Sequence, residues 1–274
     1  MEYINKSKNI KIVAGSIEIG ESVTFGDNID ICVRGIFRIG DYSRLGNNAH
    51  IRGNNVILGE HLFNSSGLNI GGGGRQHPNA NFRIGDRCTI HNNFINVCEP
   101  VEIGDDVGLS TEVSILTHGY WLSVLDGNPA TFKGVKIGNK VIVGYRSLIM
   151  MGVKICDDVV VGAQSTVVKS IKKSGIYFGM PARLLSEKIP IEGEVARRKT
   201  IEEIIIRYIP IAKYHGIKPD IKLEYPIVHF RGFAFDVETF ESWGEEDEET
   251  DDFRDYIRKY GIRIYTKRPF KSVF

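Results

Sequence analysis

The sequence predicts a mainly-β chain. A solenoid of stacked coils is expected over residues 1–185 and a small α+β appendage over residues 186–274. Three observations support this prediction: aliphatic residues recur at a spacing of six, 30 glycines accompany only 9 prolines, and the repeat ends near Leu185, where the composition changes. A strict period of six fits neither a helix of about 3.6 residues per turn nor a simple alternation, whereas a coil of three short strands accounts for it.

The clearest part of the repeat runs from Ile137 to Val167. Six aliphatic residues follow one another there at a spacing of six. The same unit recurs upstream in IGESVT, IGDYSR and IGDRCT, which begin at Ile19, Ile39 and Ile84. Such a unit cannot bury its apolar side alone, so it gains stability from stacked neighbours. Its Gly-Asp and Gly-Asn pairs are expected at corners that need left-handed backbone.

Two long segments interrupt the repeat. Residues 71–82 (GGGGRQHPNANF) and residues 117–134 carry no repeat signal, so both are expected to leave the solenoid as loops. Function tends to lie in such insertions, because a rigid scaffold holds them while their own sequences vary.

The appendage is expected to contain two helices and some strands. Residues 194–208 favour a helix that ends near Pro210. Residues 221–235 favour strand interrupted at Pro226 and Gly232, and a second helix over 252–260 precedes a last strand over 262–266. The acidic run EEDEETDD (245–252) is expected to be a solvated loop rather than a calcium site.

Composition excludes several classes of function. With 35 Lys and Arg against 34 Asp and Glu, the formal charge is +1, so neither nucleic-acid binding nor attraction to an anionic membrane is expected. The absence of a signal-peptide pattern or a long apolar run predicts a cytoplasmic protein without membrane insertion. The cysteine spacings of 56, 10 and 58 match neither a zinc site nor a redox pair, so free thiols and no metal are expected at Cys32, Cys88, Cys98 and Cys156.

His118 is the strongest candidate for catalysis. It lies at the start of the second break, separated from the repeat segment VSIL by one residue, so a rigid wall would hold it beside a loop. Acyl transfer from a thioester to a hydroxyl or an amine needs a base, and a histidine that titrates near neutrality can serve. The alternative is a loop histidine with a purely structural role.

The chain also resembles a known superfamily. The segments IGDDVGLSTEVSILTHGYW, VKIGNKVIVGYRSLIMMGVKICDDVVVGAQSTVV and FGMPARLL resemble the hexapeptide-repeat acyltransferases, most of all the maltose, galactoside and O-antigen O-acetyltransferases. The resemblance implies a left-handed parallel β-helix, a homotrimer and acetyl-CoA as acyl donor. It further implies that His118 is the base for O-acetylation of a sugar or surface glycan, and thus a place in polysaccharide biosynthesis.

The resemblance assigns roles to individual residues. The backbone N–H of Tyr145 would stabilise the oxyanion of the tetrahedral intermediate. Residue 142 is isoleucine here and tryptophan in many relatives, which removes an aromatic contact. Five residues would bind the cofactor: Gly144 beside the thioester carbonyl, Gly162 and Ala163 along the pantetheine arm, and Lys169 and Arg183 at the phosphates.

Sugar sites combine aromatic faces with amide and carboxylate groups. Asn93 and Asn96 are expected on neighbouring levels of the wall that carries His118, although asparagines also stack at solenoid corners as structural residues. The complete set of acceptor candidates is Asn93, Asn96, Tyr120, Trp121, Asp126 and Arg146.

Other functions stay open at this point. The acceptor can be the amine of a nucleotide-linked amino sugar, which would make the chain an N-acetyltransferase, or the solenoid can be a non-catalytic scaffold. A γ-class carbonic anhydrase is disfavoured, because its zinc needs two histidines five residues apart, and the next histidine after His118 is His215.

Overall fold

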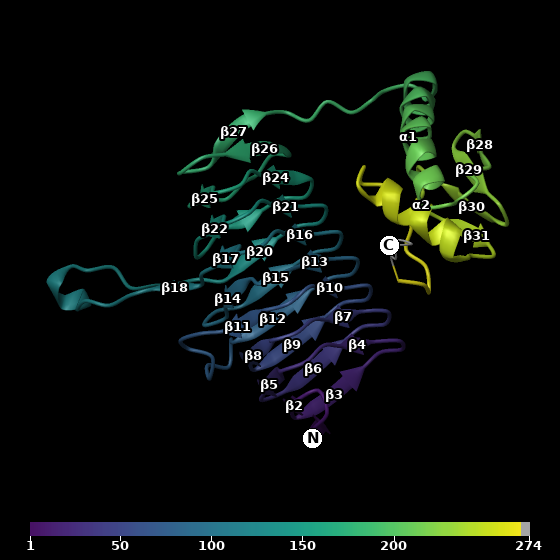
Figure 1. Cartoon of the computed structure of the whole chain (residues 1–274). Coiled ribbons are helices and arrows are strands. Elements are labelled where there is room, and N and C mark those ends of the chain that lie inside the picture. Colours follow the sequence, from purple (N-terminus) through teal and green to yellow (C-terminus); the bar gives the residue numbers. More distant parts are fainter. Residues whose placement is uncertain (270–274) are drawn as a thin grey trace. The chain divides into compact units, whose positions relative to one another are not determined.

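The computed structural model describes residues 1–269, which form two compact units, residues 1–188 and the residues from Ile189 on. The first unit is a parallel β-helix, and the second is a small α+β unit (Figure 1). The mainly-β solenoid and its appendage are therefore confirmed. Neither helix in residues 1–269 has the length and apolar character needed to cross a membrane.

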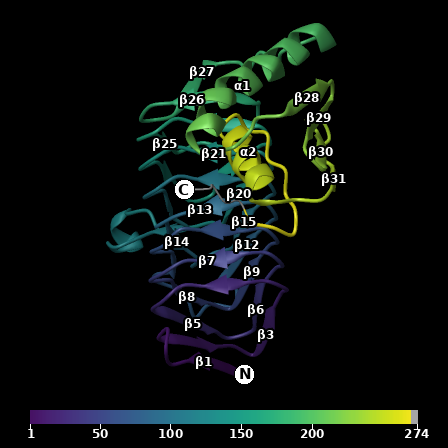
Figure 2. The ribbon, with the colours of Figure 1, turned by 45° about the vertical axis from the view of Figure 1, so that its right-hand side comes forward.

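The β-helix has three faces, and the chain visits them in the same order in every coil (Figures 1 and 2). The first face contains β1 (Glu2–Asn5), β2 (Ile10–Val13), β5 (Ile29–Val33), β8 (His50–Gly53), β11 (Asn69–Gly71), β14 (Phe94–Asn96), β17 (Ser114–Ile115), β22 (Leu148–Ile149) and β25 (Thr166–Val167). The second face contains β3 (Ser16–Ile19), β6 (Ile36–Ile39), β9 (Asn55–Leu58), β12 (Asn81–Ile84), β15 (Val101–Ile103), β20 (Val135–Ile137) and β23 (Lys154–Ile155). The third face contains β4 (Thr24–Phe25), β7 (Arg44–Leu45), β10 (Phe63–Asn64), β13 (Thr89–Ile90), β16 (Gly108–Leu109), β21 (Ile142–Val143), β24 (Val159–Val161), β26 (Gly175–Phe178) and β27 (Arg183–Ser186).

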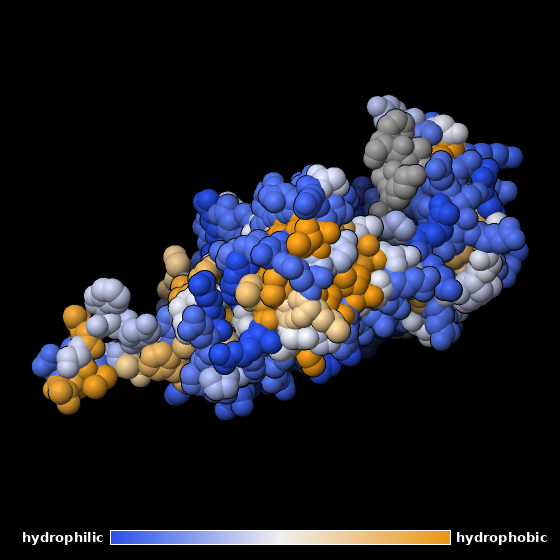
Figure 3. Space-filling view, turned by 90° about the horizontal axis from the view of Figure 1, so that it is seen from below, coloured by the Kyte–Doolittle hydropathy of each residue, from blue (hydrophilic) through white to orange (hydrophobic). Residues whose placement is uncertain are grey.

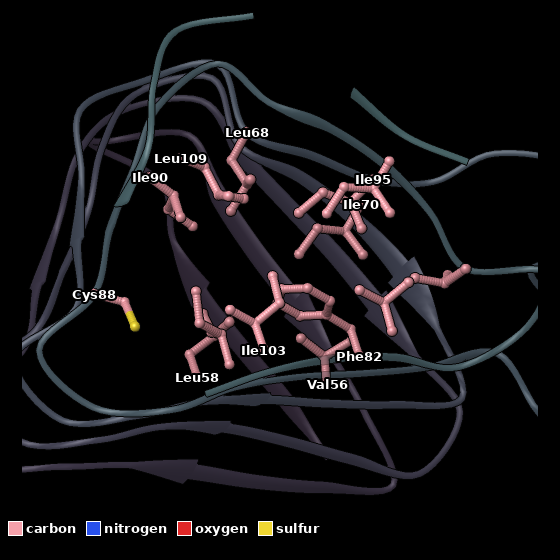
Figure 4. Packing of buried hydrophobic residues seen from close by; sticks show 14 of the residues in the cluster. Val56, Leu58, Leu68, Ile70, Phe82, Cys88, Ile90, Ile95, Ile103 and Leu109 are labelled. Carbon is pink, nitrogen blue, oxygen red and sulfur yellow. The ribbon is translucent and has the colours of Figure 1, made fainter. Parts of the chain in front are cut away.

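Inward-facing aliphatic residues stack from coil to coil and form the core. On the first face the parallel register sets Ile70, Ile95, Ile115 and Ile149 above one another, all fully buried. Figure 4 shows such side chains from all three faces filling the interior. The period of six therefore arises because each face contributes its inward residue once per coil.

We name the three edges of the β-helix the 1–2, 2–3 and 3–1 corners, after the faces that they join. At the 2–3 corner, Asp105 Oδ1 accepts from Asp86 N at 2.9 Å, and Asn139 Oδ1 accepts from Asp105 N at 2.8 Å. A Cβ on Gly85 would lie 2.1 Å from Asp105 Oδ1, so glycine is needed there for close approach. The Gly-Asp and Gly-Asn pairs do lie at corners with left-handed backbone, and the left-handed residue is the one that follows the pair, such as Asp106 with φ 57°.

Both long insertions leave from the 1–2 corner. Residues 72–80, between β11 and β12, contain no strand. Residues 117–134 are not a simple loop, because β18 (His118–Gly119) pairs antiparallel with β19 (Thr131–Phe132), and a short 3₁₀ helix (Val124–Asp126) lies between them. This hairpin, which we call the arm, projects from the β-helix (Figure 1).

In the second unit, α1 (Glu194–Tyr214) and α2 (Glu248–Arg258) accompany an antiparallel sheet. Its strands are β28 (Ile221–Glu224), β29 (Ile227–Phe230), β30 (Phe233–Asp236) and β31 (Ser242–Gly244). Turns at Pro226 and Gly232 separate the first three strands, as predicted. The strand expected over 262–266 is wrong, and β31 was not predicted.

Three boundaries in this unit differ from expectation. α1 continues past Pro210, because burial of Ala212 in its last turn outweighs the loss of one backbone hydrogen bond. α2 begins four residues early, because the Asp247 side chain caps Thr250 N at 2.8 Å. The acidic run is not a solvated loop: Asp251 and Asp252 lie inside α2 and are each 2% exposed.

Candidate active site

His118 lies at the 1–2 corner, where the chain leaves β17 for the arm. It begins β18 and pairs with Phe132 of β19. Its half-buried ring stacks on the Phe132 ring, with centroids 6.1 Å apart and an interplanar angle of 15°. The Tyr120 ring lies at 5.4 Å on a tilt. The imidazole is therefore held between the solenoid wall and the aromatic side chains of the arm.

Asn96 fixes the orientation of this imidazole. It ends β14, one coil below His118, and its Oδ1 lies 2.8 Å from His118 Nδ1. Its Nδ2 donates to the carbonyl oxygens of Gly71 at 3.1 Å and Gly73 at 3.2 Å. Because both amide hydrogens are used on carbonyls, the oxygen must face His118, so Nδ1 carries the hydrogen. In the neutral ring, Nε2 then has the free lone pair that a general base needs.

The amide oxygen of Asn96 has two further donors. Thr117 Oγ1 donates to it, and Cys98 N donates to it at 3.2 Å. Asn96 itself is only 1% exposed. All of its polar atoms are thus used inside the protein, and its expected role as a direct acceptor ligand gives way to that of a residue that positions His118.

The glycine-rich insertion covers Asn96 and reaches His118. A Cβ on Gly73 would lie 3.6 Å from His118 Nε2. Gly74 has φ 77°, and a Cβ there would lie 2.3 Å from Cys98 Sγ. Sequence reasoning identified this insertion as a loop but missed that its glycines pack against the catalytic candidate. The four consecutive glycines were the available signal, because such a run permits close backbone approach.

An open hollow lies beside His118, between the arm and the next coil. It is lined by Gly119, Tyr120, Trp121, Leu122, Asn128, Pro129, Thr131 and Met151. Of the acceptor candidates, Tyr120 and Trp121 line it, and Asp126 lies apart from it in the 3₁₀ helix of the arm.

A second group of candidate residues lies at the 3–1 corner. Gly144 follows β21 and Gly162 follows β24, so the two glycines stack in adjacent coils. A Cβ on Gly144 would lie 2.5 Å from Ala163 N, and one on Gly162 would lie 2.1 Å from the ring of Phe178. Glycine is therefore structurally required at both positions. Arg183 begins β27 opposite Phe178, so it lies at the same end of the third face.

The backbone N–H of Tyr145 differs from its counterpart lower in the solenoid. There, Asp27 N follows Gly26 and donates to Asn47 Oδ1 at 2.9 Å. Ala163 occupies the place of Asn47 above Tyr145 and has no side-chain acceptor. Tyr145 N–H accordingly has no hydrogen-bond acceptor among residues 1–269. An unpaired N–H at a half-exposed corner can donate to an oxygen that develops negative charge.

Three other candidates lie outside the His118 cluster. Asn93 precedes β14 and so lies at the 3–1 corner, and the expectation that it shares a wall with His118 is wrong. It is 1% exposed, and its Nδ2 donates to Ser110 O at 2.8 Å, which fits the structural alternative. Arg146 lies over the Tyr145 ring at 5.0 Å and pairs with Glu112, whose hydrogen bond raises the pKa of the guanidinium. Lys169 follows β25 at the 1–2 corner, away from Arg183.

The candidate residues thus form two groups separated by the first face. His118, Asn96 and Tyr120 meet at the 1–2 corner, whereas Gly144, Tyr145, Gly162, Ala163 and Arg183 meet at the 3–1 corner. No cluster of three or more histidine, cysteine or acidic residues suited to a metal ion occurs in the described part of the chain.

No family model and no curated protein matches this chain. Solved structures do. A maltose O-acetyltransferase from Clostridium difficile 630 is 24% identical over 65% of this chain and 70% of that one, with a TM-score of 0.34. A hexapeptide-repeat acetyltransferase from Vibrio cholerae is 26% identical over 48% and 74%, with a TM-score of 0.42. AntD, an N-acyltransferase from Bacillus cereus solved with dTDP and coenzyme A, is 18% identical over 71% and 91%, with a TM-score of 0.41. Each of these three proteins is an acetyltransferase or an acyltransferase, and the one from Vibrio cholerae is a hexapeptide-repeat protein.

Proposed function

We propose that this chain is an acetyl-CoA-dependent O-acetyltransferase that transfers an acetyl group to a hydroxyl of a sugar or glycan, as part of polysaccharide biosynthesis. The hydrogen bond between Asn96 Oδ1 and His118 Nδ1 is the observation that carries this proposal. This bond uses Nδ1 and leaves Nε2 for the acceptor, and the arm that begins at His118 lines an open hollow with Tyr120 and Trp121. Aromatic faces next to a base suit a sugar hydroxyl.

In the proposed reaction His118 acts first as base and then as acid. Nε2 takes the proton of the acceptor hydroxyl while the hydroxyl oxygen attacks the thioester carbonyl carbon. The tetrahedral intermediate collapses with cleavage of the carbon–sulfur bond, and the proton on Nε2 passes to the departing CoA sulfur. The products are an acetyl ester and CoA, and Asn96 stabilises the ring orientation throughout.

The 3–1 corner is the proposed site of the donor. The free Tyr145 N–H would donate to the oxyanion of the intermediate. Gly144, Gly162 and Ala163 leave the surface free of bulky side chains, which suits a narrow pantetheine arm. Arg183 lies at this corner and would bind phosphate, and Lys169 would do so from the 1–2 corner.

We further propose that the enzyme is a homotrimer in which the two corners come from different copies. The first face separates His118 from Tyr145 within one chain, so a second copy has to supply the missing corner. The arm offers exposed apolar contact surface (Figure 3), including Trp121 at 90% and Leu125 at 94% exposure. The second face instead carries ion pairs typical of a solvated surface, such as Glu18 with Arg38.

The test is thiol release from acetyl-CoA by His118→Ala, with His61→Ala at the 2–3 corner as the matched control. We expect His118→Ala to lower kcat roughly 10²- to 10⁴-fold, because proton transfer is lost, while acetyl-CoA still raises its melting temperature. His61→Ala should resemble the wild type. Unchanged kcat in His118→Ala, or no melting shift with acetyl-CoA in the wild type, would contradict the proposal. An alkali-stable product would identify an amide and an amine acceptor instead.

A further inference from the structure

Below His118, the outer side of the first face carries positively charged side chains. The register sets Arg52 beneath Gly71 and Gly71 beneath Asn96, in three successive coils. A Cβ on Gly71 would lie 3.2 Å from Arg52 Cβ, so the two residues are in direct contact. With strands about 4.8 Å apart, Arg52 starts about 10 Å below Asn96, roughly the length of two sugar rings.

The glycine-rich insertion adds a second arginine at this place. Arg75 follows Gly73, which packs on His118, by two residues, and two residues span at most about 7 Å. Arg75 is exposed and forms no ion pair or side-chain hydrogen bond in the described chain. Burial is the main cause that lowers the pKa of His50; the charges of Arg52 and Arg75 act in the same direction, and the charge of Asp30 acts against them.

Neither of the two nearby carboxylates, Asp30 and Glu99, is paired with Arg75. Asp30 is committed to Arg52, which donates to both its carboxylate and, at 2.8 Å, its carbonyl oxygen. Glu99 accepts from Asn79 Nδ2 at 3.2 Å at the other end of the insertion. The charge of Arg75 is therefore available to a ligand.

We propose that the acceptor is anionic, and that Arg75 binds its carboxylate or phosphate while His118 activates a hydroxyl of the same sugar unit. This inference rests on the proposed function. Arginine suits the task because its planar guanidinium donates two parallel hydrogen bonds to a carboxylate or a phosphate. Arg52, already paired with Asp30, contributes positive potential rather than a direct contact.

The geometry of the insertion supports a defined position for Arg75. Gly72 and Gly74 have φ of 82° and 77°, and a Cβ on either residue would approach a side-chain atom of Asn96 or Cys98 to within 2.6 Å. The backbone just before Arg75 is thus held against the wall that carries His118. A guanidinium on a backbone that is already held in place loses little conformational entropy on binding, so it can discriminate between charged and neutral acceptors. One on a long free loop could not.

The experiment compares melting shifts at fixed ionic strength with glucose, glucuronic acid and glucose 1-phosphate. The variants are Arg75→Ala and Arg75→Lys, with Arg83→Ala on the second face as the matched loss of one positive charge. We expect the two acidic sugars to raise the melting temperature of the wild type and of Arg83→Ala more than glucose does. Arg75→Ala should lose this excess, and Arg75→Lys should recover part of it.

Thiol release then gives the kinetic counterpart, with the same three sugars as acceptors. Loss of a charged hydrogen bond should lower kcat/KM for the acidic sugars about 10- to 100-fold in Arg75→Ala and leave glucose unchanged. Equal shifts for acidic and neutral sugars, or an effect of Arg75→Ala on the KM of acetyl-CoA instead, would overturn the inference. If neutral sugars are acetylated normally, the proposed function stands even though this inference fails. If no acceptor gives thiol release, the result counts against the proposed function itself. A response to glucuronic acid but not glucose 1-phosphate identifies the carboxylate, and the reverse identifies the phosphate.

Discussion

Replacement of Asn96 by alanine should damage catalysis through the orientation of His118. The change removes the acceptor of His118 Nδ1 and leaves Gly73 O and Cys98 N without their partner, whereas Gly71 O keeps its bond from Val97 N at 3.0 Å. Unpaired buried groups cost about 1–3 kcal/mol each, and water can reach part of this exposed insertion, so we expect a loss of about 2–4 kcal/mol in the free energy of unfolding. Without its hydrogen bond the imidazole can rotate and change tautomer, and removal of such a positioning partner lowers activity about 10- to 100-fold.

Asn96→Asp separates orientation from stability. A carboxylate still accepts from His118 Nδ1 and from Cys98 N, but it repels the carbonyls of Gly71 and Gly73. We therefore expect a destabilised fold that keeps most of its activity. The carboxylate also favours the protonated imidazole, so the acid limb of the pH–rate profile should move to higher pH.

The assay is kcat and KM by thiol release, measured over a range of pH and well below the melting temperature of each variant. The melting shift with acetyl-CoA should persist in both variants, because the proposed donor residues lie mainly at the 3–1 corner. Wild-type kcat in Asn96→Ala would refute the positioning role. An unmoved acid limb in Asn96→Asp would refute the contact between this side chain and the base.

Two further predictions concern other parts of the solenoid. In Ala163→Asn, the new side chain should accept from Tyr145 N–H as Asn47 accepts from Asp27 N. If this N–H stabilises the oxyanion, kcat should fall about 10²-fold. Ala163→Leu is the control for bulk, and equal kcat in the two variants would contradict the role of this N–H. Burial raises the pKa of Cys88 to about 12, so this thiol should resist thiol reagents at pH 8. The thiol of the unfolded chain has a pKa of about 8.5. The contribution of Cys88 to the free energy of unfolding is therefore fully present below that pH and declines as the pH rises toward 12. Urea unfolding of the wild type and of Cys88→Ala over this pH range measures the decline.

The coils could be predicted because their signal is local. One inward residue per face produces the period of six, and loss of that period marked both insertions at the 1–2 corner. The distinction between Asn93 and Asn96 could not be predicted, since it depends on which residue of β14 lies at which corner. Three residues apart in sequence, they lie at opposite ends of that strand, and only Asn96 meets His118.

The pairing of Asn96 with His118 spans 22 residues of sequence and depends on stacking one coil on the next. The period of six predicted that the coils stack, but not which residue of one coil lies above which residue of the next. In the second unit, Pro210 suggested a helix end and the acidic run suggested a loop, and both predictions were wrong. Burial of Ala212 and Asp252 outweighed the local conformational preferences of these residues. Tyr208 Oη and His215 Nδ1 contact the Asp252 carboxylate at 2.9–3.0 Å, partners that no local pattern indicates.

The position of β14 and β17 within the first face bears on how the β-helix can unfold and evolve. Five strands of this face precede β14 and two follow β17. A linear stack in which each coil contacts only its neighbours opens from its ends, so partial unfolding should disrupt the outer coils before it reaches Asn96 and His118. Amide hydrogens of β14 and β17 should then exchange among the slowest in the chain. Coils far below Arg52 can likewise be gained or lost over evolutionary time without moving His118, which leaves the length of the β-helix free to vary under selection for other properties.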